Sequence, residues 1–233
     1  MKFDEGKESF HLMSKGETYG GNLKMLGVPF DMTLSMKDAV EEVVVAAGWK
    51  LRMLLRSKRF YTDAELVGLY KTQLLSYLEY RTSAVYHAKR EVLWHLDRVQ
   101  HKFLEDIGVD AKTALMVFNL APLNARRDMA ILSLIQRTVL GRGPKHFRQY
   151  FKDAGKRTLV DPRHTNNEHI LRCSALGLVA IYNMLPETLR KKGQVVDFQR
   201  ELQATMKARA TEGCEDWPRT FCPRMALARH PLS

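Results

Sequence analysis

The chain has only three cysteines, Cys173, Cys214 and Cys222, and they form no CxxC pair. An odd number of cysteines at wide spacing argues against a disulfide framework. Histidines such as His164 and His230 do not supply the close paired spacing that marks zinc sites. We therefore expect no metal ligand among them, and we expect Cys173, on an apolar helical stripe, to be a small core residue.

Long hydrophobic runs are also missing. The longest, VVVAAGW at 43–49 and ALGLVAIY at 175–182, are far shorter than the roughly 20 residues that cross a bilayer. The N-terminal MKFDEGKESF mixes charges of both signs and has no apolar core, so it does not resemble a secretory signal. We expect no membrane partner and an intracellular location, nuclear or cytoplasmic.

The common catalytic motifs are absent too. The chain has no GxxxxGK[ST], GxGxxG, GxSxG or HExxH, and no Asp-Asp pair such as two-metal polymerases use to hold Mg²⁺. Its closest acidic pairs, Glu105–Asp106 and Glu215–Asp216, fall at a helix end and in a polar tail. We expect no catalytic residue, no metal and no cofactor.

Positive charge is abundant and clustered. The formal net charge is +11. Residues 50–59 hold Lys50, Arg52, Arg56, Lys58 and Arg59 with no acid, and residues 141–157 hold six Lys or Arg against one Asp. Such clusters favour a polyanion, most plausibly nucleic acid, although a solvated basic face is an equally open interpretation.

Residues 8–30 predict a short β-hairpin, with ESFHLMS and LKMLGVPF as strands and a glycine-rich turn between them. A helical period follows from Ser35, where Ser35 and Asp38 resemble a capping box. Thr62 and Glu65 predict a second helix start only a few residues after the first helix ends. We therefore expect the two helices to be antiparallel neighbours.

Further helices are predicted at about 90–107, 110–119, 122–140, 168–184 and 194–210, with Gly108 and Gly141 as stops. The aromatic residues Tyr70 and Tyr77 fit a buried stripe better than a base-stacking surface. The predicted fold is mainly α, a short N-terminal β-hairpin followed by a helical bundle. The expected divisions are a hairpin at 1–32, a helical bundle at 33–141, a basic linker at 142–167 and a C-terminal helical extension with an irregular tail at 168–233.

The order of these elements resembles the region after the palm in reverse transcriptases of non-LTR retrotransposons, the jockey-like group. The resemblance covers about residues 8–208. It is carried by six segments in the same order and with similar spacing. They are KMLGVPFDMTLSM, the basic helix after it, LYKTQLLSYLEYRTSAVY, LDRVQHKFLEDIG, LAPLNARRDMAILSLIQRTVLG and IYNMLPETLRKKGQVVDFQREL.

The resemblance implies a primer grip at the hairpin and a thumb in the helices beyond it. Lys24, Leu26, Gly27 and Val28 match the primer-grip element. The Leu-x-x-Leu-x-x-Arg-Arg and Asn-x-Leu-Pro motifs of the family match Leu120, Leu123, Arg126, Arg127, Asn183, Leu185 and Pro186. The fingers, the palm with its catalytic aspartates and any endonuclease domain have no counterpart in these residues. RNA-directed DNA polymerase activity is therefore not expected of this chain alone.

Three functions remain open from the sequence. The first is a catalytically incomplete fragment that binds RNA or an RNA/DNA template–primer duplex through phosphates, using Lys24, Gly27, the five cations of 50–59, Arg126 and Arg127. The second is a helical module that docks on a partner protein. The third is a working polymerase whose palm comes from a separate chain. A sequence-specific helix-turn-helix at 110–140 is less favoured, because the segment is dense in apolar residues.

Overall fold

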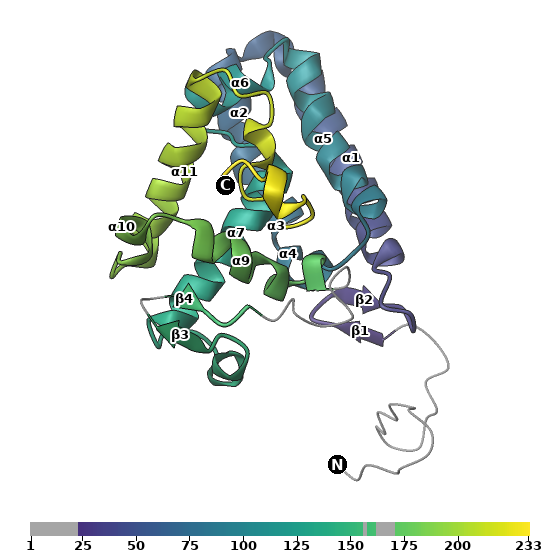
Figure 1. The fold of residues 1–233 in the computed structure, drawn as a ribbon. Helices are drawn as coiled ribbons and strands as arrows, with labels where there is room; N and C mark the ends of the chain where they lie inside the picture. The colour runs from purple at the N-terminus through teal and green to yellow at the C-terminus, as the bar shows by residue number, and fades with distance from the viewer. Residues whose placement is uncertain (1–22, 156–157, 162–170) are drawn as a thin grey trace, which may run out of the picture.

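The computed structural model describes residues 23–155, 158–161 and 171–233, and this part of the chain is mainly helical (Figure 1). A two-stranded antiparallel hairpin comes first, and the helices follow it. The predicted fold class is therefore confirmed. No helix in these ranges is long and apolar enough to cross a membrane.

The hairpin is shorter than the sequence predicts. Its strands are β1 (Leu23–Met25) and β2 (Val28–Phe30), so the segment expected to be one strand contains both. The predicted first strand, at 8–14, lies outside the described residues. The turn is Leu26–Gly27, where both φ angles are positive, 50° and 78°. A two-residue hairpin loop of this kind needs such angles at both positions, which explains the glycine.

An aspartate, rather than the predicted capping box of Ser35 and Asp38, organises the start of α1 (Lys37–Arg56). The Asp31 carboxylate accepts hydrogen bonds from the backbone N–H groups of Ser35 and Met36, at 2.9 and 2.8 Å. Thr33 also donates to it, and these bonds hold the Asp31 pKa well below its usual range. Met36 is the helix N-cap and has no side-chain capping bond.

The second helical stretch runs back along α1. The predicted capping box of Thr62 and Glu65 is present and starts α2 (Asp63–Tyr70), which continues through a π-helical segment, Lys71–Leu75, into α3 (Ser76–Glu79). At its far end Arg81 donates to the Ala39 carbonyl oxygen, in the first turn of α1. The predicted antiparallel arrangement is confirmed.

The remaining helices of the N-terminal bundle include three that the sequence predicts, α5 (Arg90–Ile107), α6 (Ala111–Met116) and α7 (Leu123–Val139), and one that it does not, α4 (Thr82–Val85). Gly108 and Gly141 follow their helices with positive φ, as predicted. Helix α5 lies beside α1 and runs in the same direction, since the Lys58 ammonium, just after α1, donates to the Asp106 main-chain oxygen near the end of α5.

The C-terminal part contains shorter elements than the sequence predicts. A second hairpin, β3 (Asp153–Gly155) with β4 (Thr158–Leu159), lies within the expected linker. In the described part of the helix expected at 168–184, α9 (Leu178–Met184) begins only after a 3-10 turn, Ala175–Gly177. The two helices that follow are α10 (Glu187–Arg190) and α11 (Val195–Thr211).

Two apolar clusters make up the core of the described residues. The first joins the hairpin to α1, the α2–α3 stretch and α5, with Tyr70 and Phe103 stacked at 4.3 Å between ring centroids. The second joins α7, α9 and α11 to the C-terminal segment, where Phe221 is fully buried. That segment was expected to be an irregular tail. It is irregular, but it is part of the core.

Candidate nucleic-acid interface

The structure places the residues predicted to bind nucleic acid in three separate regions. Lys24 and Gly27 lie in the hairpin, before the start of α1. Five cations lie at the other end of α1 and in the turn after it, and two arginines lie on α7. Helix α1 has 20 residues, which at 1.5 Å per residue separates its two ends by about 30 Å. The three regions therefore cannot act as one compact site.

At the hairpin, the two residues predicted to contact nucleic acid are Lys24 and Gly27. The Lys24 ammonium is exposed but lies 3.8 Å from the Glu42 carboxylate, which also pairs with Arg81 at 3.2 Å. These cations lower the Glu42 pKa, chiefly through the Arg81 hydrogen bond. A Cβ added at Gly27 would meet nothing within 4 Å. The glycine is therefore explained by its positive φ and not by a bulge or a close approach of another backbone.

The two arginines on α7 are occupied by ion pairs between helices. Arg126 forms a two-pronged contact with Glu79 of α3, with Nη2 and Oε2 3.0 Å apart. Arg127 is only 4% exposed and donates from Nη2 to Asp97 of α5, at 2.9 Å. Burial raises the Asp97 pKa, while the Arg127 charge opposes that rise. Both arginines therefore join α7 to its neighbouring helices.

The C-terminal end of α1 is different, because its cations have no carboxylate partner among the residues that the structure describes. The side chains of Lys50, Arg52, Arg56, Lys58 and Arg59 are all exposed. None of the five forms an ion pair with a carboxylate in the described ranges. Lys58 donates to the Asp106 main-chain oxygen, and positive charge that no carboxylate neutralises is available to a polyanion.

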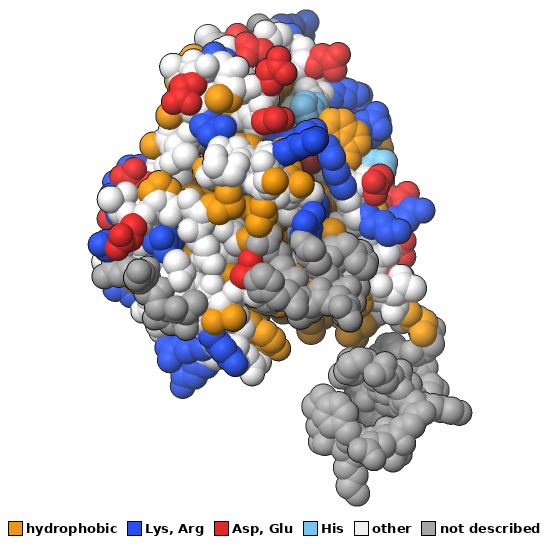
Figure 2. Space-filling model, viewed as in Figure 1, with side chains coloured by type: hydrophobic (Ala, Val, Ile, Leu, Met, Phe, Trp, Pro, Cys, Tyr) orange, Lys and Arg blue, Asp and Glu red, His pale blue; other side chains and the backbone are white. Residues whose placement is uncertain are grey.

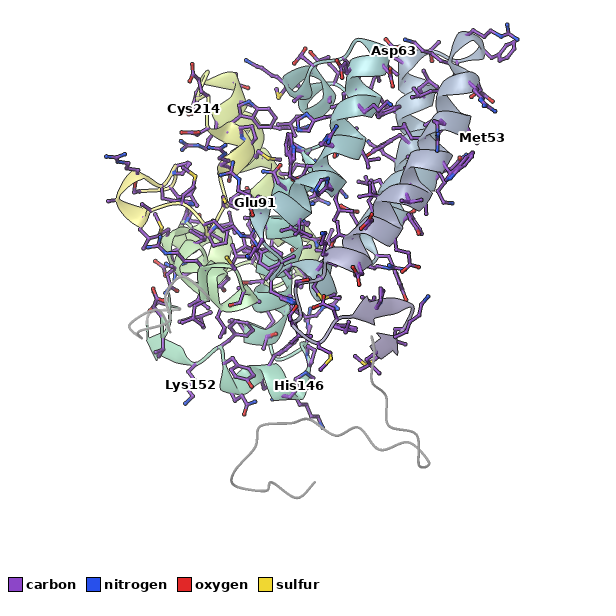
Figure 3. The ribbon with its side chains drawn as sticks, turned by 90° about the vertical axis from the view of Figure 1, so that its right-hand side faces the viewer. Met53, Asp63, Glu91, His146, Lys152 and Cys214 are labelled. Carbon is purple, nitrogen blue, oxygen red and sulfur yellow. The ribbon has the colours of Figure 1, made fainter. Side chains whose placement is uncertain are left out.

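Exposed apolar side chains lie among these cations. On the outer face of α1, Val45, Trp49 and Met53 recur at a spacing of four, and each is more than half exposed. Met53 projects from the helix away from the bundle (Figure 3). In the turn after α1, Phe60 is 69% exposed. The predicted binding residues do not include this group, although Trp49 lies off the buried stripe and could have been found by that position.

Two of the arginines lie over these rings. The guanidinium carbon of Arg52 is 4.2 Å from the centroid of the Trp49 ring, and that of Arg59 is 4.6 Å from the Phe60 ring. A third cation, Lys50, points toward a different neighbour, the Tyr77 ring, at 5.4 Å. Contacts of this geometry are cation–π interactions. The two arginines place positive charge beside the exposed rings of Trp49 and Phe60.

Charge changes sign along α1. Its first turns carry Asp38, Glu41 and Glu42, and its last turns carry the arginines. On the face drawn in Figure 2, basic and acidic side chains are mixed over the upper part of the molecule, and a further group of cations lies near β3 at the lower left. The end of α1 is therefore the most favourable location for phosphate among the predicted positions.

Several of the other positions carried over from the family resemblance have a structural role. Leu120, Leu123 and Leu185 are buried in the core. The Asn183 side chain pairs with both the N–H and the carbonyl oxygen of Leu159 in β4, each at 2.8 Å. These residues position α7, α9 and the second hairpin.

A polar cavity lies on another side of the molecule. It has a volume of ≈ 480 Å³ and is bounded by α5, α7 and the C-terminal segment. Its wall includes Asp128, whose Oδ1 accepts a hydrogen bond from the Tyr86 hydroxyl at 2.6 Å. Burial raises the Asp128 pKa to about 7. Arg224 of the C-terminal segment also lines the cavity and donates to the Tyr86 main-chain carbonyl oxygen.

Possible metal-binding groups do not gather in the described chain. No group of three or more His, Cys, Asp or Glu side chains within 23–155, 158–161 and 171–233 is arranged to hold a metal ion. The cysteines Cys173, Cys214 and Cys222 are free thiols. His164 and His169 lie outside the described residues. No family model matches the chain, and no curated protein or solved structure matches it.

Proposed function

We propose that the chain binds nucleic acid through its phosphates, without sequence preference, at the C-terminal end of α1. The observation that carries the proposal is the group of five exposed cations there, none of which pairs with a described carboxylate. Phosphate contacts of this kind position a nucleic acid but do not read its bases.

The motif order supports a more specific form of the proposal. In it, the chain corresponds to the primer grip and thumb of a jockey-like reverse transcriptase, and binds RNA or an RNA/DNA template–primer inside the cell. A short hairpin followed by a helical bundle agrees with that order. Because the matching segment lacks catalytic aspartates, DNA synthesis would require a palm supplied by another chain.

The salt dependence of binding tests the phosphate contacts. Fluorescence anisotropy with a labelled 20-nucleotide RNA, measured between 50 and 200 mM salt, gives the slope of log affinity against log salt. Five phosphates predict a slope of about −3.5 to −4.5. The variant R52A/R56A/R59A should reduce that slope by about 2 to 3, because three contacts are lost.

A control variant with the same change in net charge is K152A/K191A/R200A. These three cations are exposed and lie away from α1 (Figure 1). Lys152 comes just before β3, Lys191 just after α10, and Arg200 on α11. The control should keep the parent slope. A slope near zero in the parent, or equal losses in the two variants, would refute the assignment of phosphate binding to this surface.

A helical protein-interaction module is the second candidate, and the exposed Val45, Trp49 and Met53 favour it. A protein partner covering these side chains would remain bound after nuclease treatment and at high salt. Nucleic acid would be released by either treatment.

A further inference from the structure

We infer that the nucleic acid held at the end of α1 is a single strand whose bases stack on Trp49 and Phe60. This inference rests on the phosphate-binding function proposed above, and it names the substrate class more narrowly. It differs from the template–primer duplex that the family resemblance implies. The reason is that the bases of a single strand can stack on the exposed aromatic rings, whereas the bases of a duplex are already paired and stacked on one another.

The exposure of the rings is the first step. Trp49 is 60% exposed and Phe60 is 69% exposed, unlike the buried rings of Tyr70 and Phe103. Tyr80, Trp94 and Tyr150 are exposed to a similar degree, so what distinguishes Trp49 and Phe60 among the described residues is the arginine that lies over each ring. A large apolar ring in water is unfavourable, and a flat π-face can recover that cost by stacking on a base. Base stacking tolerates every sequence, because all bases present such a face.

The positions of the arginines are the second step. Arg52 lies over the Trp49 ring and Arg59 over the Phe60 ring, so each aromatic ring has a cation within 5 Å of its centroid. A nucleotide offers the complementary pair, since its base is flat and its phosphate is anionic. Proteins that bind single strands without sequence preference combine a positive groove with aromatic rings in this way.

The axial rise from Trp49 to the end of α1 is also within reach of a short strand. Trp49 lies seven residues before Arg56, the last residue of α1, and Phe60 ends the 3-10 turn that follows. The helical rise alone places that end of α1 about 10 Å beyond Trp49. A flexible single strand can place separate bases on two such rings. In a duplex the bases are paired and stacked internally, so only phosphates would meet this surface.

Binding of a 10-nucleotide oligo(dT) and of a blunt 10-base-pair duplex, at one salt concentration, tests the inference. Removing both rings in W49A/F60A should weaken oligo(dT) binding by about 5-fold or more for each base that loses its stack. Duplex affinity should stay at the parent value, and so should the salt slope when it is measured between 50 and 200 mM salt, because the phosphate contacts remain. The variant W49F/F60Y keeps both π-faces and should retain oligo(dT) affinity.

Tyr150 provides a matched control, since it is half exposed and lies near the second hairpin, away from α1. The variant Y150A should bind oligo(dT) like the parent. Tighter binding of the duplex than of oligo(dT), equal losses for both ligands in W49A/F60A, or no loss at all would overturn the inference. In each of these cases a reduced salt slope in R52A/R56A/R59A would leave the proposed function standing. An unchanged slope would overturn both.

Discussion

Replacing Arg127 with methionine leaves the Asp97 carboxylate buried without its counter-charge at the contact between α5 and α7. The pair is short, 2.9 Å from Nη2 to Oδ2, and only 4% of Arg127 and 13% of the Asp97 side chain are exposed. Removing one member of a buried pair costs about 3–5 kcal/mol. We therefore predict that R127M loses about that much unfolding free energy at pH 8.

The loss should depend on pH in a defined direction. Burial already raises the Asp97 pKa above its ordinary value, and loss of the Arg127 charge should raise it further. A carboxyl whose pKa is raised in the folded state binds its proton more readily there than in the unfolded chain. The folded state of R127M should therefore lose stability as the pH rises. The difference between R127M and the parent should be smaller at pH 5.5 than at pH 8.

Urea unfolding followed by circular dichroism at 222 nm measures both effects. The double variant R127M/D97L removes both charges from the contact and should recover much of the loss, because no isolated ion remains. The coupling energy between the two positions should reach about 0.5–3 kcal/mol. Oligonucleotide binding by the folded R127M should equal that of the parent. A stability change below about 1 kcal/mol together with weaker RNA binding would refute the structural role and restore Arg127 to the binding surface.

Two other features predict stability changes. Asn at position 128 keeps an acceptor for the Tyr86 hydroxyl and carries no charge, so D128N should be at least as stable as the parent at pH 8. The Asp128 pKa is raised to about 7, so the stability of the parent should fall relative to that of D128N as the pH rises from 5 to 7. Thermal melts over this range measure the difference, and parallel curves of melting temperature against pH would contradict the prediction. Loss of the α2 capping box in T62A should cost about 1 kcal/mol in urea unfolding, whereas T62S should behave like the parent, and an equal loss in both would show that the cap is not the cause.

The elements that the sequence predicts well are those with strong local signals. Helix α5 repeats apolar residues at helical spacing over five turns and ends at Gly108, which takes the left-handed conformation expected of a C-terminal glycine. The Thr62–Glu65 capping box needs only four consecutive residues, and it forms as predicted. Such features depend on neighbours within one or two turns, so a single sequence contains the necessary information.

Periodicity fails as a signal where a close approach of the backbone or an irregular buried segment decides the structure. The break before α9 follows from the Ser174 side chain, which accepts the Leu176 N–H, and from Gly177, whose added Cβ would lie 2.6 Å from the Leu171 carbonyl oxygen. The C-terminal segment has no periodicity, yet it inserts Phe221 into the second core cluster. Neither close approach nor burial without a repeating pattern can be read from spacing alone.

The candidate site shows the same limit. Arg126 and Arg127 are adjacent basic residues in a basic chain, and their acidic partners, Glu79 and Asp97, lie 47 and 30 residues earlier. Charge counted in a local window cannot reveal such pairing. The cluster at 50–59 is different, because it has no acid in its own segment and acquires no carboxylate partner among the described residues.

The distribution of charge along α1 limits how a nucleic acid can approach. The helix is about 30 Å long, which equals roughly nine base pairs of duplex at 3.4 Å each. A duplex laid along its whole length would place phosphates beside Asp38, Glu41 and Glu42 before reaching Arg52 and Arg56. Like charges at that end oppose such a path. A template–primer that touches both the hairpin and the basic end would therefore pass Asp38, Glu41 and Glu42, whereas a short single strand at the basic end does not meet these three acids.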